Sequence, residues 1–139
     1  MNQNTPISEV MTDHVIVGHP SSTLQQLKEL FMNYNLHHLV ITDEGSGKVV
    51  GIVTASDLLK FVMNNREADL SHTPVNEIMV KDVVFVTPST SLGESVSRLN
   101  KANFSALVVE EDGKPVGFMS VRDLPRIMSF MFTENYNYD

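Results

Sequence analysis

Two stretches of this chain carry the same chemically useful pattern, Gly-x-x-Thr/Ser-x-x-Asp, at the end of an apolar segment. The two copies consist of Gly51, Thr54 and Asp57, and of Gly117, Ser120 and Asp123. A hydroxyl placed where a strand passes into a helix lies beside free backbone N–H groups and the positive end of the helix dipole, which favours an anion such as phosphate. The carboxylate three residues later can accept hydrogen bonds from the vicinal hydroxyls of a ribose. The glycines allow a ligand or a backbone segment to approach closely.

The same spacing has a purely structural interpretation, which stays open. Thr-x-x-Asp before an apolar helix is a close variant of the capping box, in which the side chains satisfy only their own backbone. Duplication copies a cap as faithfully as a binding site. In the second copy, Pro125 would remove a backbone hydrogen bond from a helix capped by Ser120. Asp123 would then be the cap of a helix that starts at Leu124, and it would partly serve the backbone.

The pattern is duplicated because most of the chain is an internal repeat. Residues 6–11 (PISEVM) recur 68 residues later as 74–79 (PVNEIM), and Pro20 recurs as Pro88. The turn at 44–48 is two residues longer than its counterpart in the second copy, so the separation between matching residues falls from 68 to 66 after it. With this separation, 51–57 (GIVTASD) matches 117–123 (GFMSVRD). An insertion confined to a turn is the kind that a fold tolerates.

Each copy predicts the same elements: a short helix, a strand, a helix, two strands joined by a Gly-containing turn, and a last helix. Thr5 and Thr73 are expected to cap the short opening helices, with Pro6 and Pro74 at the first helical position. The predicted strands are 15–17, 39–42 and 49–54, then 83–86, 107–110 and 116–120, and the last helices are 56–64 and 122–131. Two capping boxes are expected to open the middle helices, Thr23 with Gln26 and Ser91 with Glu94.

This order predicts an α/β (α+β) fold in which a unit of roughly 60 residues, marginal on its own, is duplicated. Two copies packed sheet against sheet would share a core and form a pseudo-twofold cleft. The predicted boundaries are 1–64 and 74–132 for the two domains. The polar linker is 65–73, and 133–139 is a tail that is either frayed or a contact arm.

Composition excludes several classes of function. A net charge of −7 with ten scattered Lys and Arg disfavours nucleic acid, and the absence of cysteine excludes disulfides and thiolate metal sites. No apolar run approaches the roughly 20 residues that span a bilayer, and no signal-peptide pattern opens the chain, so we expect a soluble cytoplasmic protein without a membrane association. His37 and His38 would point to opposite faces of a strand, and no nucleophile elbow is present, so we expect neither a metal site nor an enzyme.

Taken together, these motifs resemble a tandem pair of CBS (cystathionine-β-synthase) domains, also called a Bateman module. The resemblance extends from about Pro6 to Phe132. It rests on the Pro-x-x-x-x-Met openings, on segments 12–17 and 38–43, on Pro20, and on both Gly-x-x-Thr/Ser-x-x-Asp motifs. It implies two β-α-β-β-α units related by a pseudo-twofold axis, commonly assembled as a homodimer. It also implies a regulatory module that binds AMP, ADP, ATP or S-adenosylmethionine, needs no obligatory cofactor, and signals to a partner protein. A ligand-free dimerisation scaffold is the alternative.

The resemblance also assigns roles to single residues. Phosphate contacts are implied for Thr54 and Ser120, and ribose contacts for Asp57 and Asp123. Adenine is expected around Val15, His37 and His38, or around Val83, Ser105 and Ala106. A site in this family tends to combine the Asp motif of one repeat with strand residues of the other.

Such crossing would make the two sites unequal. One would contain Ser120, Arg122 and Asp123 with His37 and His38, and the other Thr54, Ser56 and Asp57 with Ser105 and Ala106. The first site should hold a phosphorylated ligand, because Arg122 supplies a permanently charged guanidinium with several N–H donors. The second should be empty, weak or suited to a less anionic ligand.

Overall fold

The chain forms two compact units. In the computed structural model, which describes residues 1–102 and 104–136, one unit is Ile16–Val83 and the other is Met1–Val15 together with the chain from Val84 onward. We call them the first-repeat unit and the second-repeat unit after the sheet that each contains. The units divide the chain differently from the repeat, because the opening segment of each repeat belongs to the unit that holds the sheet of the other.

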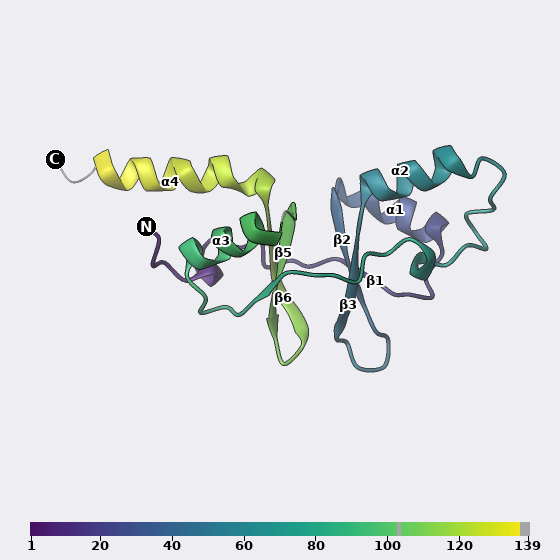
Figure 1. Cartoon of the computed structure of the whole chain (residues 1–139), viewed down its shortest axis with the longest axis horizontal. Helices are drawn as coiled ribbons and strands as arrows, with labels where there is room; N and C mark the ends of the chain where they lie inside the picture. Colours follow the sequence, from purple (N-terminus) through teal and green to yellow (C-terminus); the bar gives the residue numbers. More distant parts are fainter. Residues whose placement is uncertain (103, 137–139) are drawn as a thin grey trace. The chain divides into compact units, whose positions relative to one another are not determined.

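The first-repeat unit is a three-stranded mixed sheet with two helices against one of its faces (Figure 1). Its strands are β1 (Val17–Gly18), β2 (His38–Thr42) and β3 (Val49–Thr54), in the order β1-β2-β3. Strand β1 is parallel to β2, and β2 is antiparallel to β3. The helices are α1 (Leu24–Tyr34) and α2 (Ala55–Asn64). The apolar faces of the helices pack with residues of the sheet and of the opening segment 74–79 in one core. Its buried members are Leu24, Leu27, Phe31, Leu39, Ile41, Val53, Leu58 and Val75.

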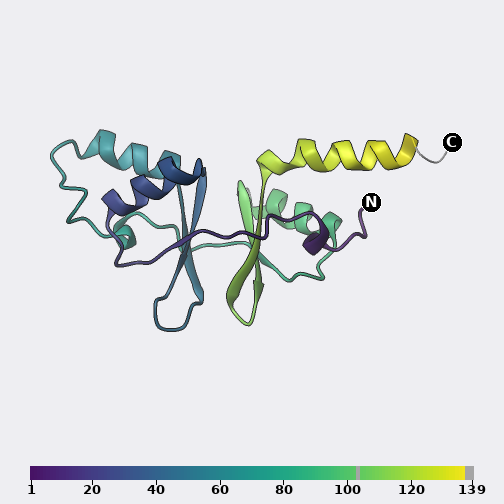
Figure 2. The same ribbon diagram turned by 180° about the vertical axis from the view of Figure 1, so that it is seen from behind.

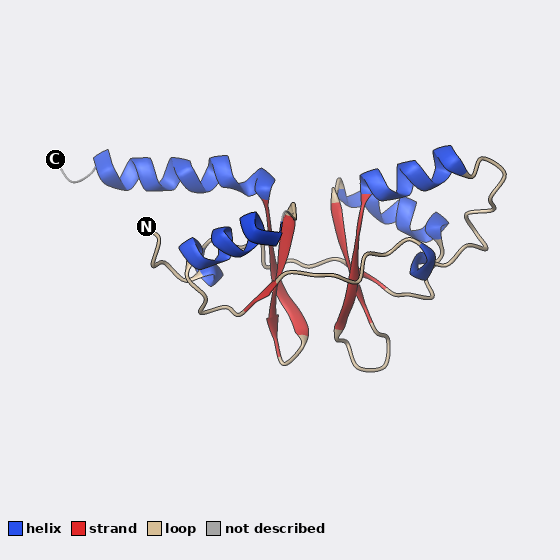
Figure 3. Cartoon of the chain, viewed as in Figure 1, coloured by secondary structure: helices blue, strands red, loops and turns tan. Residues whose placement is uncertain are grey.

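The second-repeat unit has the same topology, with β4 (Phe85–Val86), β5 (Ala106–Glu111) and β6 (Lys114–Ser120) in the order β4-β5-β6. Its helices are α3 (Leu92–Ala102) and α4 (Leu124–Tyr136), and again both lie on one side of the sheet (Figure 3). The β5–β6 turn contains Asp112 and Gly113, both with positive φ, as the tight two-residue hairpin requires. The predicted duplicated α/β fold is therefore confirmed.

The opening segments differ from the prediction. They form single turns of 3₁₀ helix, η1 (Ile7–Glu9) and η2 (Val75–Glu77), with Pro6 and Pro74 at the N-cap rather than inside. Thr5 and Thr73 cap other helices: the Thr5 carbonyl accepts from Leu92 N–H at 2.8 Å, and the Thr73 carbonyl from Leu24 N–H at 2.9 Å. Each opening segment thus satisfies a first-turn amide of the long helix of the other repeat, and Figure 2 shows the N-terminal segment beside α3.

Apolar anchors hold these segments in place. Ile7 is fully buried in the core of the second-repeat unit, among Val86, Leu92 and Leu107. Val75 is fully buried in the core of the first-repeat unit. Both segments therefore form part of the hydrophobic core of their units.

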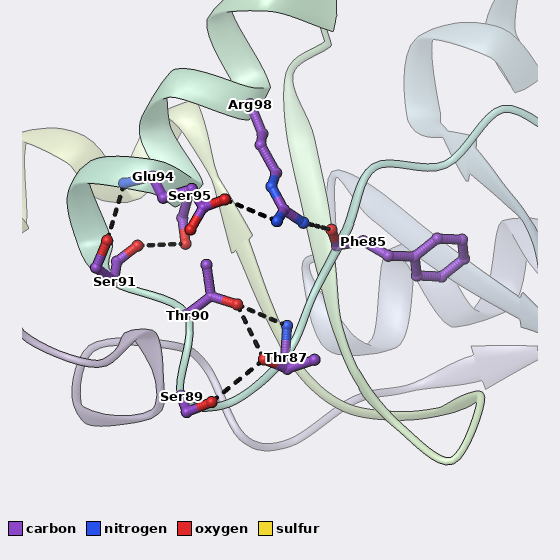
Figure 4. A network of polar contacts seen from close by, with 8 residues as sticks. All are labelled: Phe85, Thr87, Ser89, Thr90, Ser91, Glu94, Ser95 and Arg98. Carbon is purple, nitrogen blue, oxygen red and sulfur yellow. Dashed lines mark hydrogen bonds and ion pairs between the residues drawn. The ribbon is translucent and has the colours of Figure 1, made fainter.

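The remaining differences concern element ends. Strand β1 begins at Val17 instead of Val15, and β4 at Phe85 instead of Val83. The capping box of Thr23 with Gln26 is confirmed. Ser91 accepts from Glu94 N–H as expected, but the Glu94 carboxylate pairs with Arg98 at 2.8 Å (Figure 4). Helix α4 includes residues 133–136 of the predicted tail, and 137–139 lie outside the described residues.

Candidate functional site

The first copy of the motif lies at the junction of β3 and α2. Thr54 is the N-cap of α2, and its Oγ1 accepts from Asp57 N–H at 3.0 Å. Asp57 Oδ2 in turn accepts from Thr54 N–H at 3.1 Å. This reciprocal pair is a capping box, so the structural interpretation of the motif is confirmed here.

The second copy lies at the junction of β6 and a short 3₁₀ turn, η3 (Val121–Asp123), that leads into α4. Asp123 Oδ2 accepts from Ser120 N–H at 2.8 Å, and Ser120 Oγ accepts from Arg122 N–H at 3.2 Å. Helix α4 starts at Leu124, the start that Pro125 favours, instead of at residue 122 of the predicted range. Asp123 does serve the backbone in part, although it bonds the amide of Ser120 and not the first turn of α4.

The caps leave part of each motif for other contacts. One carboxylate oxygen of Asp57, Oδ1, makes no hydrogen bond or ion pair with any described residue, and the side chain is partly exposed. The hydroxyl of Thr54 accepts in the cap and keeps its own proton to donate. The exposed Ser56 N–H, a first-turn amide of α2, has no partner within the described part of the chain. An acceptor, a hydroxyl donor and an amide donor are therefore grouped at one end of the sheet.

Further predicted residues lie at the starts of β2 and β5 or directly before them, at the same ends of the two sheets as the motifs. The His37 carbonyl accepts from Ala55 N–H at 3.0 Å, and His38 lies opposite Thr54 in the β2–β3 register. In the other unit, the Ser105 carbonyl accepts from Val121 N–H at 2.9 Å, and Ala106 lies opposite Ser120. These residues thus lie beside the motif of their own repeat.

Val15 and Val83 are the last residues before the chain passes from one unit to the other. The predicted sites that cross between repeats combine residues of different units, so that combination stays a prediction.

For the two motif glycines, the structure shows one of the two predicted purposes, the close approach of another segment of the chain. A methyl group on Gly51 would come within 3.0 Å of the Val80 carbonyl oxygen and of Met79 Sδ, and one on Gly117 would overlap the Met11 side chain. Met11 and Met79 end the two Pro-x-x-x-x-Met openings. The glycines therefore accommodate the opening segments, which is the predicted close approach of a backbone segment.

We expect Gly51→Ala to destabilise the protein by about 1–3 kcal/mol, the usual range for overpacking. The added methyl would push against the Val80 carbonyl, which accepts from Ile52 N–H at 2.9 Å and cannot move without breaking that bond. Urea unfolding measures the loss. Gly45→Ala is the control, because its methyl would meet only Asp43 Oδ2 at 3.4 Å; equal stability of both variants would contradict the account.

Sequence reasoning missed Arg126. Its Nη2 donates to the Val10 carbonyl at 2.9 Å and lies 3.7 Å from Asp123 Oδ1. The only sequence signal is a basic residue in the first turn of a helix, where the dipole disfavours a cation.

A second cluster of polar residues, Asp69 with Ser71 and His72, resembles a catalytic set in composition only. Ser71 Oγ donates to Asp69 Oδ1 at 2.6 Å, and His72 Nδ1 lies 2.7 Å from Asp69 Oδ2. These hydrogen bonds, the one from Ser71 first, hold the pKa of Asp69 below its usual value. All three are exposed and Ser71 N–H also bonds Asp69, so the cluster is a local turn. Among the described residues, no group of three or more His, Asp or Glu could hold a metal ion.

A duplicated unit of three mixed strands and two helices, with a hydroxyl–carboxylate cap after the third strand of each, defines a tandem α/β module. The model of the CBS domain matches residues 7–64 and 75–129, and the chain belongs to the CBS-domain family as a tandem pair.

Three comparisons illustrate the relationship. An uncharacterised 17.7 kDa protein of Acidianus ambivalens is 32% identical over 95% of this chain and 78% of its own. The crystal structure of a putative acetoin utilization protein (AcuB) from Vibrio cholerae is 26% identical, with a TM-score of 0.82 over 96% of each chain. The CBS domain pair of protein MJ0100, solved with 5′-methylthioadenosine and S-adenosyl-L-methionine, is 25% identical, with a TM-score of 0.78 over 89% of this chain and 99% of that one.

Several curated relatives are much longer, and some are enzymes. The chain spans 23% of an L-aspartate semialdehyde sulfurtransferase and 24% of a homoserine O-acetyltransferase, so it matches only a part of each. None of the described helices is long and apolar enough to cross a membrane.

Proposed function

We propose that this CBS pair binds an adenosine-containing ligand, AMP, ADP, ATP or S-adenosylmethionine, without transforming it, and that occupancy regulates a partner protein. The proposal rests on the polar atoms of the first motif that the capping box does not use. Asp57 Oδ1 has no partner among the described residues, and the Thr54 hydroxyl keeps a proton to donate.

These groups suit a nucleoside. A carboxylate oxygen accepts from ribose hydroxyls, and charge-assisted hydrogen bonds of this kind are the stronger ones. The Thr54 hydroxyl and the Ser56 N–H are donors at a helix N-terminus, which suits a phosphate or another electron-rich group. Because the hydrogen bond to Thr54 N–H already fixes the Asp57 side chain, ligand binding would cost that side chain little conformational entropy.

Relatives support the class of ligand. The MJ0100 pair was crystallised with 5′-methylthioadenosine and S-adenosyl-L-methionine, both of which contain adenosine. The CBSX2 structure, which shares the fold at 22% identity, was solved in complex with AMP. Transfer of this ligand class to the present chain is part of the proposal.

The alternative, a ligand-free scaffold that forms homodimers, is favoured by two observations. Both motifs are complete caps without any ligand. The helices of the first-repeat unit also expose Met32, Leu59 and Met63, beside a shallow apolar cavity of about 380 Å³ lined by residues of α1 and α2. A scaffold would dimerise through such a surface and would be indifferent to adenosyl compounds.

A thermal-shift series with AMP, ATP, S-adenosylmethionine and adenosine separates the two. The proposal predicts a rise in Tm with at least one compound, because a ligand at a hundred times its Kd adds about 2.7 kcal/mol to the free energy of unfolding. Guanosine monophosphate is the control for non-specific anion binding. No shift with any adenosyl compound would leave the scaffold as the function.

A further inference from the structure

We infer that Arg126 determines the charge of the ligand accepted beside Asp123, so that the two motifs prefer ligands of different charge. The inference rests on the proposed function and adds to it a selectivity for each motif. Arg126 and the residues that it contacts lie in the second-repeat unit, in its α4, η3 and N-terminal segment.

Arg126 is held from two sides. Its Nη2 donates to the Val10 carbonyl at 2.9 Å, where the chain leaves η1. The same nitrogen lies 3.7 Å from Asp123 Oδ1, the carboxylate oxygen that the cap leaves over. The hydrogen bond to a fixed carbonyl keeps the guanidinium near Asp123, while 46% of the arginine side chain remains exposed.

Helix stability does not explain an arginine at this position. Arg126 is the third residue of α4, where the N-terminal end of the dipole disfavours a cation. Its contacts with the Val10 carbonyl and with Asp123 hold the cation beside the second motif in spite of the dipole. The nearby Arg122 adds a second exposed cation, whose side chain has no hydrogen bond or ion pair within the described residues.

The first motif lacks this arrangement. The residue equivalent to Arg126 is Lys60, which is exposed and forms no ion pair with Asp57 or any other described residue. Asp57 therefore keeps an unneutralised carboxylate oxygen, whereas Asp123 shares its oxygen with a fixed positive charge. A phosphate group is repelled less beside Asp123, and a neutral or cationic adenosyl compound is favoured beside Asp57.

Two-dimensional NMR titration of the full chain with AMP and with adenosine tests this, because it reports affinity separately at each motif. The amides of Ser120 and Arg122 report on the second motif, and those of Ser56 and Asp57 on the first. In the wild type, the preference for AMP over adenosine should be larger at the second motif. Arg126→Gln should reduce that preference about fivefold, the range of a half-exposed ion pair, and leave the first motif unchanged.

Arg98→Gln is the matched control. Arg98 also joins a backbone carbonyl to a carboxylate, through Phe85 at 2.8 Å and Glu94 at 2.8 Å (Figure 4). It lies on α3, and neither of these partners belongs to the motif. Its loss should not change the AMP preference. Arg126→Lys should retain most of the preference because it keeps the charge.

Each outcome decides the inference. If the wild type binds neither AMP nor adenosine, the inference is overturned, and the thermal-shift series with ATP and S-adenosylmethionine decides the proposed function separately. If both bind and Arg126→Gln keeps the AMP preference, the inference alone is overturned. Should Arg126→Gln fail to fold, Asp123→Asn gives the opposite test: it removes the negative charge beside Arg126 and should raise the AMP preference, and an unchanged preference would overturn the inference.

Discussion

Replacing Ile7 by alanine should destabilise the sheet of the second repeat by about 2–5 kcal/mol, the usual range for a buried Ile→Ala change. Ile7 lies more than seventy residues before that sheet in the chain, yet its side chain is fully buried in the same core as Val86, Leu107 and Met119. The loss combines the transfer of apolar surface with the cavity left behind, since a close-packed interior relaxes only in part.

Hydrogen exchange with mass spectrometry measures this effect by location. Ile7→Ala should lose more protection in β5 and β6 than in β2 and β3. Val75→Ala is the matched control in the other opening segment, and it should show the reverse pattern because Val75 is buried in the first-repeat core. Loss of protection confined to residues 1–15 would show that the N-terminal segment is not part of the second-repeat core.

The second large effect concerns Asp57, whose capping and binding roles can be separated. Asp57→Ala removes the acceptor of Thr54 N–H and should cost about 1 kcal/mol of stability, as loss of a cap does. Asp57→Asn keeps an oxygen for that cap and should cost less. It should still weaken binding of an adenosyl ligand about tenfold or more, because a hydrogen bond to a charged acceptor is worth roughly 1.5–3 kcal/mol.

Urea unfolding and the NMR titration together test this separation. Gln26→Ala is the control, since Gln26 belongs to the capping box of α1 in the same unit. It should lose stability without losing affinity. If Asp57→Asn binds the ligand as tightly as the wild type, Asp57 is a cap and nothing more.

Most of the local structure is determined by the sequence itself. The repeat, the two hairpins and the long helices follow from short-range signals, such as apolar periodicity and the Thr23–Gln26 capping box, which act within a few residues. Pro125 correctly places the start of α4 at Leu124, because proline restricts the backbone wherever it lies. The family also follows from the order of these motifs.

Tertiary structure alone decided which segments complete each core and which atoms remain at the motifs. Nothing local indicates that Ile7 packs with the second repeat or that Met79 covers Gly51, because both contacts join distant parts of the chain. Likewise, the spacing Thr-x-x-Asp fits a cap and also allows a binding site. Only the tertiary structure shows that Oδ2 of each aspartate is used by the backbone, and that Arg126 approaches Oδ1 of Asp123 because the Val10 carbonyl holds it there.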